Sequence, residues 1–143
     1  NNMPIIEPGG GRIFKRMNDM TVKVHSADTN GTYEICEEKC PPGFESRRHM
    51  HAKDFESFYM VSGSARWEVG DEVVEAVKGH TIHIPPNTPH KVKSEEGCEM
   101  LCIFGPGNQE GQFEEMSNLS EEQQQDDELK KSILAKYNMV PLE

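Results

Sequence analysis

Four side chains in this sequence are suited to holding a divalent metal ion. His49 and His51 are two residues apart, Glu56 follows His51 after a short gap, and His90 belongs to a separate segment. Imidazole nitrogens and a carboxylate oxygen are ligands that divalent transition metals accept. The sequence therefore predicts one such ion as a cofactor. The ligand types leave its identity open among Fe, Mn, Ni, Cu, Co and Zn.

The spacing of these residues allows them to converge. Residues two apart on a β-strand point to the same face, so the imidazoles of His49 and His51 can reach one ion. A turn before Glu56 lets the next strand return beside them. The turn Pro85–Pro89, which contains three prolines, limits the freedom of His90. Three neutral imidazoles and one carboxylate leave a charge of about +1 on a divalent ion, which favours an enolate, phenolate or carboxylate ligand.

The segment that positions these residues has the pattern of a β domain. Short runs of alternating character are separated by turn signals rich in Gly, Pro, Asn and Asp. This spacing is typical of a sandwich or barrel. The expected strands are Thr21–His25, Thr32–Glu38, Ser46–His51, Glu56–Val61, Ala65–Val69, Val73–Val77, His80–Ile84, Lys91–Lys93 and Cys98–Phe104.

We expect three parts along the chain. Residues 1–20 are rich in Gly and Pro and predict an N-terminal arm, either extended or an edge strand. Residues 21–107 hold the β-barrel, and residues 108–143 form a C-terminal helical extension. In the extension, a short helical piece is expected at Phe113–Met116.

A longer helix is predicted after Ser120. Ser120 and Gln123 have the spacing of a capping box, and acidic residues follow in the first turn. An apolar stripe at helical spacing then predicts a helix lying against the outside of the β domain. The stripe consists of Leu129, Ile133, Leu134 and Tyr137.

Composition excludes several classes of partner. The chain of 143 residues has a formal charge of −10, which argues against nucleic acid or an anionic membrane. No apolar run approaches the length of a membrane helix of ~20 residues. The four cysteines lack metal-knuckle spacing, so we expect buried, reduced thiols and a cytoplasmic location. Neither local pair can form a disulfide on a strand, but a cross-strand bridge stays open.

The segment around the first two histidines resembles the first motif of the cupin superfamily. That motif is a glycine, five residues, His-x-His, three or four residues, a glutamate, six residues and a glycine. Gly43, His49, His51, Glu56 and Gly63 occupy every fixed position.

A later segment resembles the second motif of the same superfamily. Gly79, Pro85 and His90 match it, whereas Asn87 replaces a glycine and Ser94 replaces an asparagine. Asn is the next most tolerant residue of a left-handed turn, so the first departure is mild. Ser94 is not a ligand position.

The resemblance implies an all-β fold, an antiparallel jelly-roll (cupin) barrel with a C-terminal helix packed outside. It implies a metal in the barrel mouth held by His49, His51, Glu56 and His90, and a homodimer. The C-terminal segments, including Phe104–Gly107, resemble single-domain quercetin dioxygenase-like cupins.

Three further residues are candidates for a substrate pocket. Arg47 shares the parity of the two histidines and could orient an anionic substrate, or pair with an acid at the barrel rim. Phe58 and Met60 share the parity of Glu56 and could form apolar walls, or pack only in the core.

These observations favour a metal-dependent enzyme acting on a small molecule. The leading reaction is that of a dioxygenase on a small enolic or phenolic compound, in which the resemblance gives Glu56 a catalytic role as a base. One alternative uses the metal as a Lewis acid in a non-oxidative isomerase, lyase or cyclase. Another is a non-catalytic protein that binds a small ligand.

Overall fold

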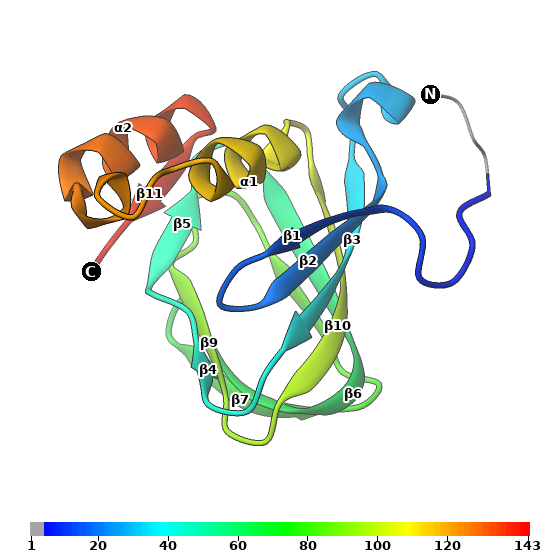
Figure 1. Cartoon of the computed structure of the whole chain (residues 1–143). Helices are drawn as coiled ribbons and strands as arrows, with labels where there is room; N and C mark the ends of the chain where they lie inside the picture. Colours follow the sequence, from blue (N-terminus) through cyan, green and yellow to red (C-terminus); the bar gives the residue numbers. More distant parts are fainter. Residues whose placement is uncertain (1–4) are drawn as a thin grey trace.

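The structure, a computed structural model, describes residues 5–143. Over this range, eleven strands form one antiparallel barrel, and two α-helices lie near one of its ends (Figure 1). The all-β jelly-roll expected from the sequence is confirmed. The strands are β1 (Arg12–Lys15), β2 (Asp19–Val24), β3 (Glu34–Cys40), β4 (Phe44–Glu45), β5 (His49–His51), β6 (Phe55–Val69), β7 (Glu72–Val77), β8 (Thr81–Ile84), β9 (His90–Ser94), β10 (Cys98–Gly105) and β11 (Met139–Pro141). The helices are η1 (Ser26–Thr29), α1 (Gln109–Ser117), η2 (Gln123–Gln125) and α2 (Asp127–Lys136).

The strands follow the order β1-β2-β3-β10-β6-β9-β5-β11, with β4 paired to β9, and β7 and β8 paired to β6. Neighbours in this order are mostly distant in sequence, which is the mark of a jelly-roll. None of the helices in the described range has the length and apolar character needed to cross a membrane.

Strand β6 corrects the prediction of two separate strands, Glu56–Val61 and Ala65–Val69. It is one strand of 15 residues that changes sheet at Gly63. Before Gly63 it pairs with β8 and β10, and after it with β7 and β9. Gly63 has φ of 75°, and a Cβ there would lie 2.2 Å from the carbonyl oxygen of Gly97. Only glycine fits, so the motif residue serves as the corner of the barrel.

The inward side of β10 organises the interior. Residues opposite one another on β3, β10 and β6 form successive layers. The layer nearest α1 contains Glu34, Phe104 and Glu56, and the next contains Cys36, Cys102 and Phe58. Each of these six residues is buried. Glu34 and Glu56 therefore lie on opposite sides of Phe104 in this layer.

Both ends of the described chain extend the sheet. Strand β1 pairs with β2 as an edge strand, one of the two forms expected for residues 1–20. Residues 1–4 of that arm lie outside the described range. Strand β11, which the sequence did not predict, pairs with β5 beyond the last helix. The division of the chain after residues 20 and 107 stays a prediction.

The helical extension contains the two expected helices, but α1 is longer than the piece expected at Phe113–Met116, and α2 begins later than the helix expected after Ser120. Ser120 and Gln123 exchange the hydrogen bonds of a capping box, at 2.9 and 3.1 Å. This box precedes the short helix η2 and not the longer helix α2. Helix α2 begins at Asp127 because Asp126 accepts a hydrogen bond from the backbone nitrogen of Leu129. In the predicted stripe, Ile133 is buried and the other members are half-buried, as expected.

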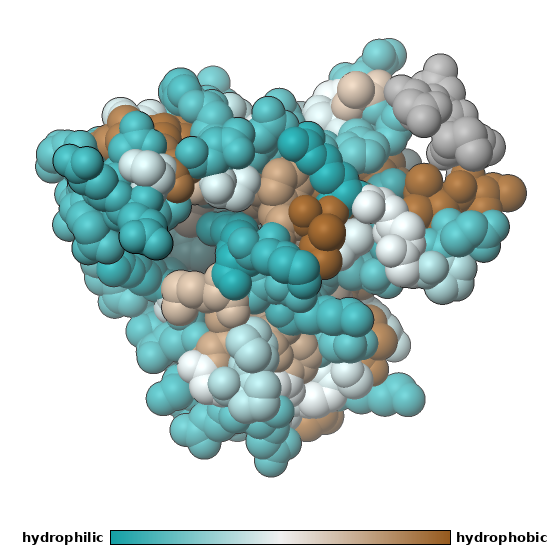
Figure 2. Space-filling model, viewed as in Figure 1, coloured by the Kyte–Doolittle hydropathy of each residue, from teal (hydrophilic) through white to brown (hydrophobic). Residues whose placement is uncertain are grey.

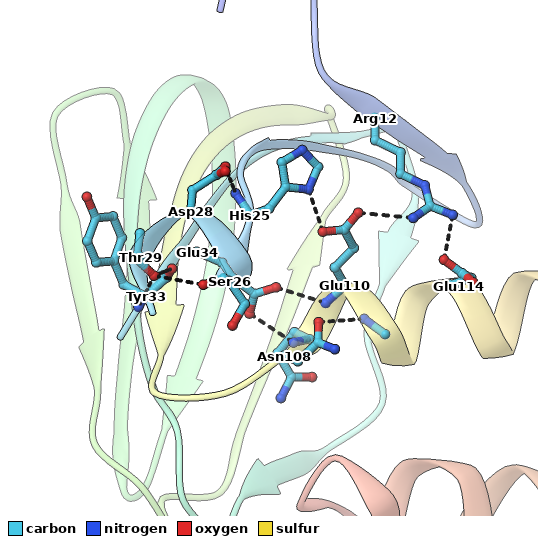
Figure 3. A network of polar contacts seen from close by, with 12 residues as sticks. Arg12, His25, Ser26, Asp28, Thr29, Tyr33, Glu34, Asn108, Glu110 and Glu114 are labelled. Carbon is cyan, nitrogen blue, oxygen red and sulfur yellow. Dashed lines mark hydrogen bonds and ion pairs between the residues drawn. The ribbon is translucent and has the colours of Figure 1, made fainter. Parts of the chain in front are cut away.

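Glu34 anchors the start of α1 to the barrel (Figure 3). Its two carboxylate oxygens accept hydrogen bonds from the backbone nitrogens of Gln109 (2.8 Å) and Glu110 (3.0 Å). The carboxylate of Glu110 in turn accepts a hydrogen bond from Arg12 and lies 2.6 Å from Nδ1 of His25. Burial raises the pKa of Glu34 to about 7, although the two amide hydrogen bonds partly oppose the shift.

This raised pKa predicts that acidification stabilises the fold through Glu34. Between the unperturbed pKa of 4.5 and about 7 the folded chain binds a proton that the unfolded chain does not, so the contribution is present at pH 5 and lost as pH rises through 7. On going from pH 7.5 to pH 5 in chelator, we expect the parent to gain on the order of 2 kcal/mol in free energy of unfolding relative to Glu34→Gln, measured by urea denaturation. Glu37→Gln, an exposed change on the same strand, should follow the parent. Parallel pH profiles for the parent and Glu34→Gln would contradict this account.

Candidate metal centre

Three strands bring the four predicted ligands together. His49 and His51 are the two ends of β5, Glu56 is the second residue of β6, and His90 opens β9. His49 is paired directly with His90 in the β5–β9 ladder. On the other side of β5, Met139 and Pro141 of β11 pair with His51 and His49. The short ligand strand is thus held between two neighbours.

The ligand atoms of this cluster converge on a small volume. One nitrogen or oxygen from each of His49, His51, Glu56 and His90 lies within 4.8 Å of the others. The Oε1 atom of Glu56 is 3.1 Å from Nε2 of His51 and 3.1 Å from Nε2 of His90. His51, Glu56 and His90 are buried, and His49 is half-buried. The cluster has the size and composition to hold one metal ion.

Unpaired atoms at the centre support this fit. Within the described range, Glu56 Oε1 and His90 Nε2 are buried and have no hydrogen-bond partner, despite their separation of 3.1 Å. Buried polar atoms are normally paired, because an unpaired one costs about 1–3 kcal/mol. Polar tips that are close together but lack the angles of hydrogen bonds are suited to a shared cation.

Backbone carbonyls orient two of the imidazoles. The Nδ1 atom of His49 lies 2.7 Å from the carbonyl oxygen of Arg47, and that of His90 lies 2.9 Å from the carbonyl oxygen of Thr88. A neutral imidazole that donates from Nδ1 keeps a lone pair on Nε2. Both rings are therefore held in the tautomer that a metal at Nε2 requires.

The turn before His90 is fixed to the ligand strand. Asn87, at the position where the motif has glycine, adopts φ of 61°, so it takes the left-handed conformation expected for it. Its backbone nitrogen donates to the carbonyl oxygen of His51 at 2.7 Å. Strand β5 thus helps to position the turn that precedes His90.

The electrostatics of the cluster favour an ionised Glu56 carboxylate and a neutral His49 imidazole. Burial alone would raise the pKa of Glu56, yet His51 and His90 together hold that pKa below its usual value. Burial and the neighbouring His90 lower the pKa of His49 to about 4. Burial lowers the pKa of His51, but the charge and contact of Glu56 outweigh it and raise that pKa. At neutral pH, His49 is a ready metal ligand because no proton must be displaced.

The three residues predicted to line a substrate pocket differ in their positions. Phe58 and Met60 are buried on β6, and the ring centroid of Phe58 lies 4.6 Å from that of Trp67. Arg47 is exposed. The carbonyl oxygen of Arg47 lies 2.7 Å from Nδ1 of His49. Contact of any of the three with a substrate stays a prediction.

Two charged residues were missed by the sequence analysis: Glu38 in the barrel interior and Arg16 on the exposed β1–β2 hairpin. Glu38 is buried on β3, where Asn18 donates to Oε2 and the thiol of Cys102 lies 3.2 Å from Oε1. Burial raises the pKa of Glu38, against the opposing effect of Cys102 and the charge of Arg16. Strand parity was the available signal, because it places residue 38 on the same face as Cys36 and Cys40.

Arg16 projects from the β1–β2 hairpin toward α1. Its guanidinium carbon lies 5.3 Å from the ring centroid of Phe113. The ring centroids of Phe113 and Phe104 are 6.2 Å apart, and Phe104 lies opposite Glu56 in the β10–β6 ladder. Figure 2 shows this face, which is largely hydrophilic and hollowed below the helices, on the side where β5 lies. The guanidinium of Arg16 therefore lies against Phe113 of α1.

Comparison with known proteins agrees with the motif analysis. A family model for the Cupin domain matches residues 37–104, a span that contains all four cluster residues. Residues 37–104 are thus a cupin domain. The chain is 35% identical over 74 residues to an uncharacterized protein of Methanocaldococcus jannaschii. That match covers 50% of the chain and 59% of the archaeal protein.

Solved structures share the fold at low sequence identity. An RmlC-like cupin from Shewanella frigidimarina has a TM-score of 0.66 and 15% identity, over 76% of this chain and 96% of that one. KdgF from Halomonas sp. has a TM-score of 0.59 and 19% identity, over 74% and 86%. A protein from Thermotoga maritima described as a predicted oxalate decarboxylase has a TM-score of 0.58 and 18% identity, over 61% and 78%.

Replacement of the carboxylate should weaken metal binding. In Glu56→Gln we expect the affinity for Mn²⁺, Ni²⁺ or Zn²⁺ to fall by at least about 100-fold in calorimetric titration, because loss of even an outer-shell partner costs about 10–100-fold. His83→Ala is a matched control, since His83 lies on β8 and bonds to Ser57 outside the cluster. Unchanged affinity in Glu56→Gln would show that the metal binds elsewhere.

Proposed function

We propose that this cupin is a metal-dependent enzyme that acts on a small enolic or phenolic compound with dioxygen as co-substrate. The observation that supports it best is the convergence of three imidazoles and one buried carboxylate on one point. When bound, the metal supplies Lewis acidity, which lowers the pKa of a hydroxyl group brought to it. Four protein ligands leave one or two positions open on a five- or six-coordinate ion.

The residues around the centre have distinct roles in this proposal. His49, His51, Glu56 and His90 hold the ion. Glu56 is also the candidate base, as the resemblance to other cupins suggests; its lowered pKa keeps it ionised but makes it a weaker base than a free carboxylate. Buried apolar residues of β6, Phe58 and Met60, exclude water from the interior side.

A non-oxidative reaction is the second candidate. The solved structures most similar to the chain include a predicted oxalate decarboxylase from Thermotoga maritima, an oxalate decarboxylase from Bacillus subtilis, and KdgF. A decarboxylase of oxalate acts on a small dianion, and a centre of net charge about +1 also suits such a substrate. A non-oxidative isomerase, lyase or cyclase, which would use the metal only as a Lewis acid, falls under this second candidate as well.

Two further expectations from the sequence stay predictions. A homodimer would cover exposed apolar residues of β6 and β7, among them Tyr59, Val61 and Val77. The cytoplasmic location rests on the unpaired thiols alone.

Turnover should require both the metal and His49. We expect oxygen uptake by metal-loaded protein over a panel of flavonols, enols and dicarboxylates, and its loss in His49→Ala and after chelation. His80→Ala, which changes a histidine in the turn before β8, should retain it. Turnover that continues under anaerobic conditions supports the non-oxidative candidate, and saturable binding without turnover supports a binding protein. Full activity in His49→Ala would contradict both enzymatic proposals.

The substrate-orienting cation can be identified by comparing two arginines. We propose Arg16, whose guanidinium carbon lies 5.3 Å from the ring centroid of Phe113 in α1, in preference to Arg47; both side chains are exposed. Arg16→Gln should raise KM for an anionic substrate about tenfold or more with a smaller change in kcat, since a charged hydrogen bond contributes roughly 1.5–3 kcal/mol. Arg47→Gln is the matched variant and should leave KM unchanged. The reverse pattern would restore the prediction made from strand parity.

A further inference from the structure

Two pairs of cysteines face each other across strands β3 and β10. Cys98 is directly opposite Cys40, and Cys102 is directly opposite Cys36. All four are buried and free. Residues directly opposite in an antiparallel ladder have Cα atoms about 4.5–5.5 Å apart, which lies within the range of about 4.4–6.8 Å that a disulfide spans. The backbone therefore places both pairs at a separation suited to a bond.

The two pairs differ in their access to solvent. Cys40 and Cys98 are each 6% exposed and line a groove of about 500 Å³ at the surface. Cys36 and Cys102 are 0% exposed and do not line it. The groove also contains Arg16 and Lys39 among its lining residues. A small polar reagent can thus reach one pair and not the other.

The accessible pair is also unequal in acidity. A hydrogen bond between the two thiols lowers the pKa of Cys98 and raises the pKa of Cys40. Cys40 lies in addition 3.6 Å from the buried carboxylate oxygen Oε2 of Glu38, which disfavours a thiolate there. Because the thiolate is the reactive form of cysteine, Cys98 is the nucleophile of the pair and Cys40 is the partner that retains its proton.

We infer that Cys40 and Cys98 form a redox-active dithiol, which a hydroperoxide entering the groove oxidises to a disulfide. The Cys98 sulfur attacks one peroxide oxygen, the O–O bond breaks, and a sulfenic acid and water are formed. The Cys40 sulfur then attacks the Cys98 sulfur, the S–O bond breaks, and a second water leaves with the Cys40 proton. With hydrogen peroxide, two thiols lose two electrons and two hydrogens in total, and one peroxide becomes two waters.

The consequence is a covalent link between two neighbouring strands at the end of the barrel away from α1. The bond would also remove the thiol that Cys40 presents to Glu38. This property does not depend on the proposed enzymatic activity, since neither cysteine belongs to the metal cluster.

The test is treatment of the folded, metal-free chain with hydrogen peroxide, followed by alkylation and peptide mapping. Cleavage after Lys39 separates Cys36 from Cys40, and cleavage after Glu99 separates Cys98 from Cys102. We expect two of the four thiols to be lost and one peptide pair to be joined through Cys40 and Cys98. The intact mass should fall by two hydrogens, and a thiol reductant should restore it.

Two variants sharpen the result. Cys40→Ala should prevent the bond and leave a sulfenic acid on Cys98 that dimedone traps, whereas Cys36→Ala should form the bond as the parent does. The parent map does not depend on either variant folding. A bond between Cys36 and Cys102, a link between two chains, or four unreacted thiols in the parent would overturn the inference.

Discussion

The site depends on one electrostatic constraint, the burial of the Glu56 carboxylate among three imidazoles. A buried charge is costly unless a counter-charge accompanies it. The Nε2 atoms of His51 and His90 both lie 3.1 Å from Oε1 of Glu56. Two of the three imidazoles direct Nδ1 to backbone carbonyls, so their remaining nitrogens face the carboxylate as lone pairs rather than donors. A cation at the centre would supply a counter-charge to this buried carboxylate.

The barrel couples this cluster to the helices through strand β10. Phe104 separates Glu56 on one side from Glu34 on the other, and its ring also contacts Phe113 of α1. Glu34 binds the first backbone nitrogens of that helix, so the helix is anchored one strand away from the metal ligands. The C-terminal strand then returns to pair with β5. The helical extension is thus part of the support of the site and is not merely attached to the outside.

Particular residues show what could be predicted and what could not. Strand parity predicted that His49 and His51 converge, and the left-handed conformation of Asn87 followed from its place in a glycine position. Parity for Arg47 required a strand over Ser46–His51, whereas residues 46–48 lie between β4 and β5, so the role of Arg47 stays a prediction. The capping box at Ser120 formed its expected hydrogen bonds, yet Asp126 begins the helix because a nearby residue offers a better-placed cap.

The sequence alone determined the candidate ligand set and the sharp turns, because alternation along a strand, the freedom of glycine and the rigidity of proline are local properties. Tertiary structure alone decided that β11 pairs with β5, that the charge of Arg16 acts on the buried Glu38, and that Cys40 lies opposite Cys98. These relations depend on which distant strands pair and in which register. Pairing is set by burial of the whole interior, and no short stretch of sequence contains that information.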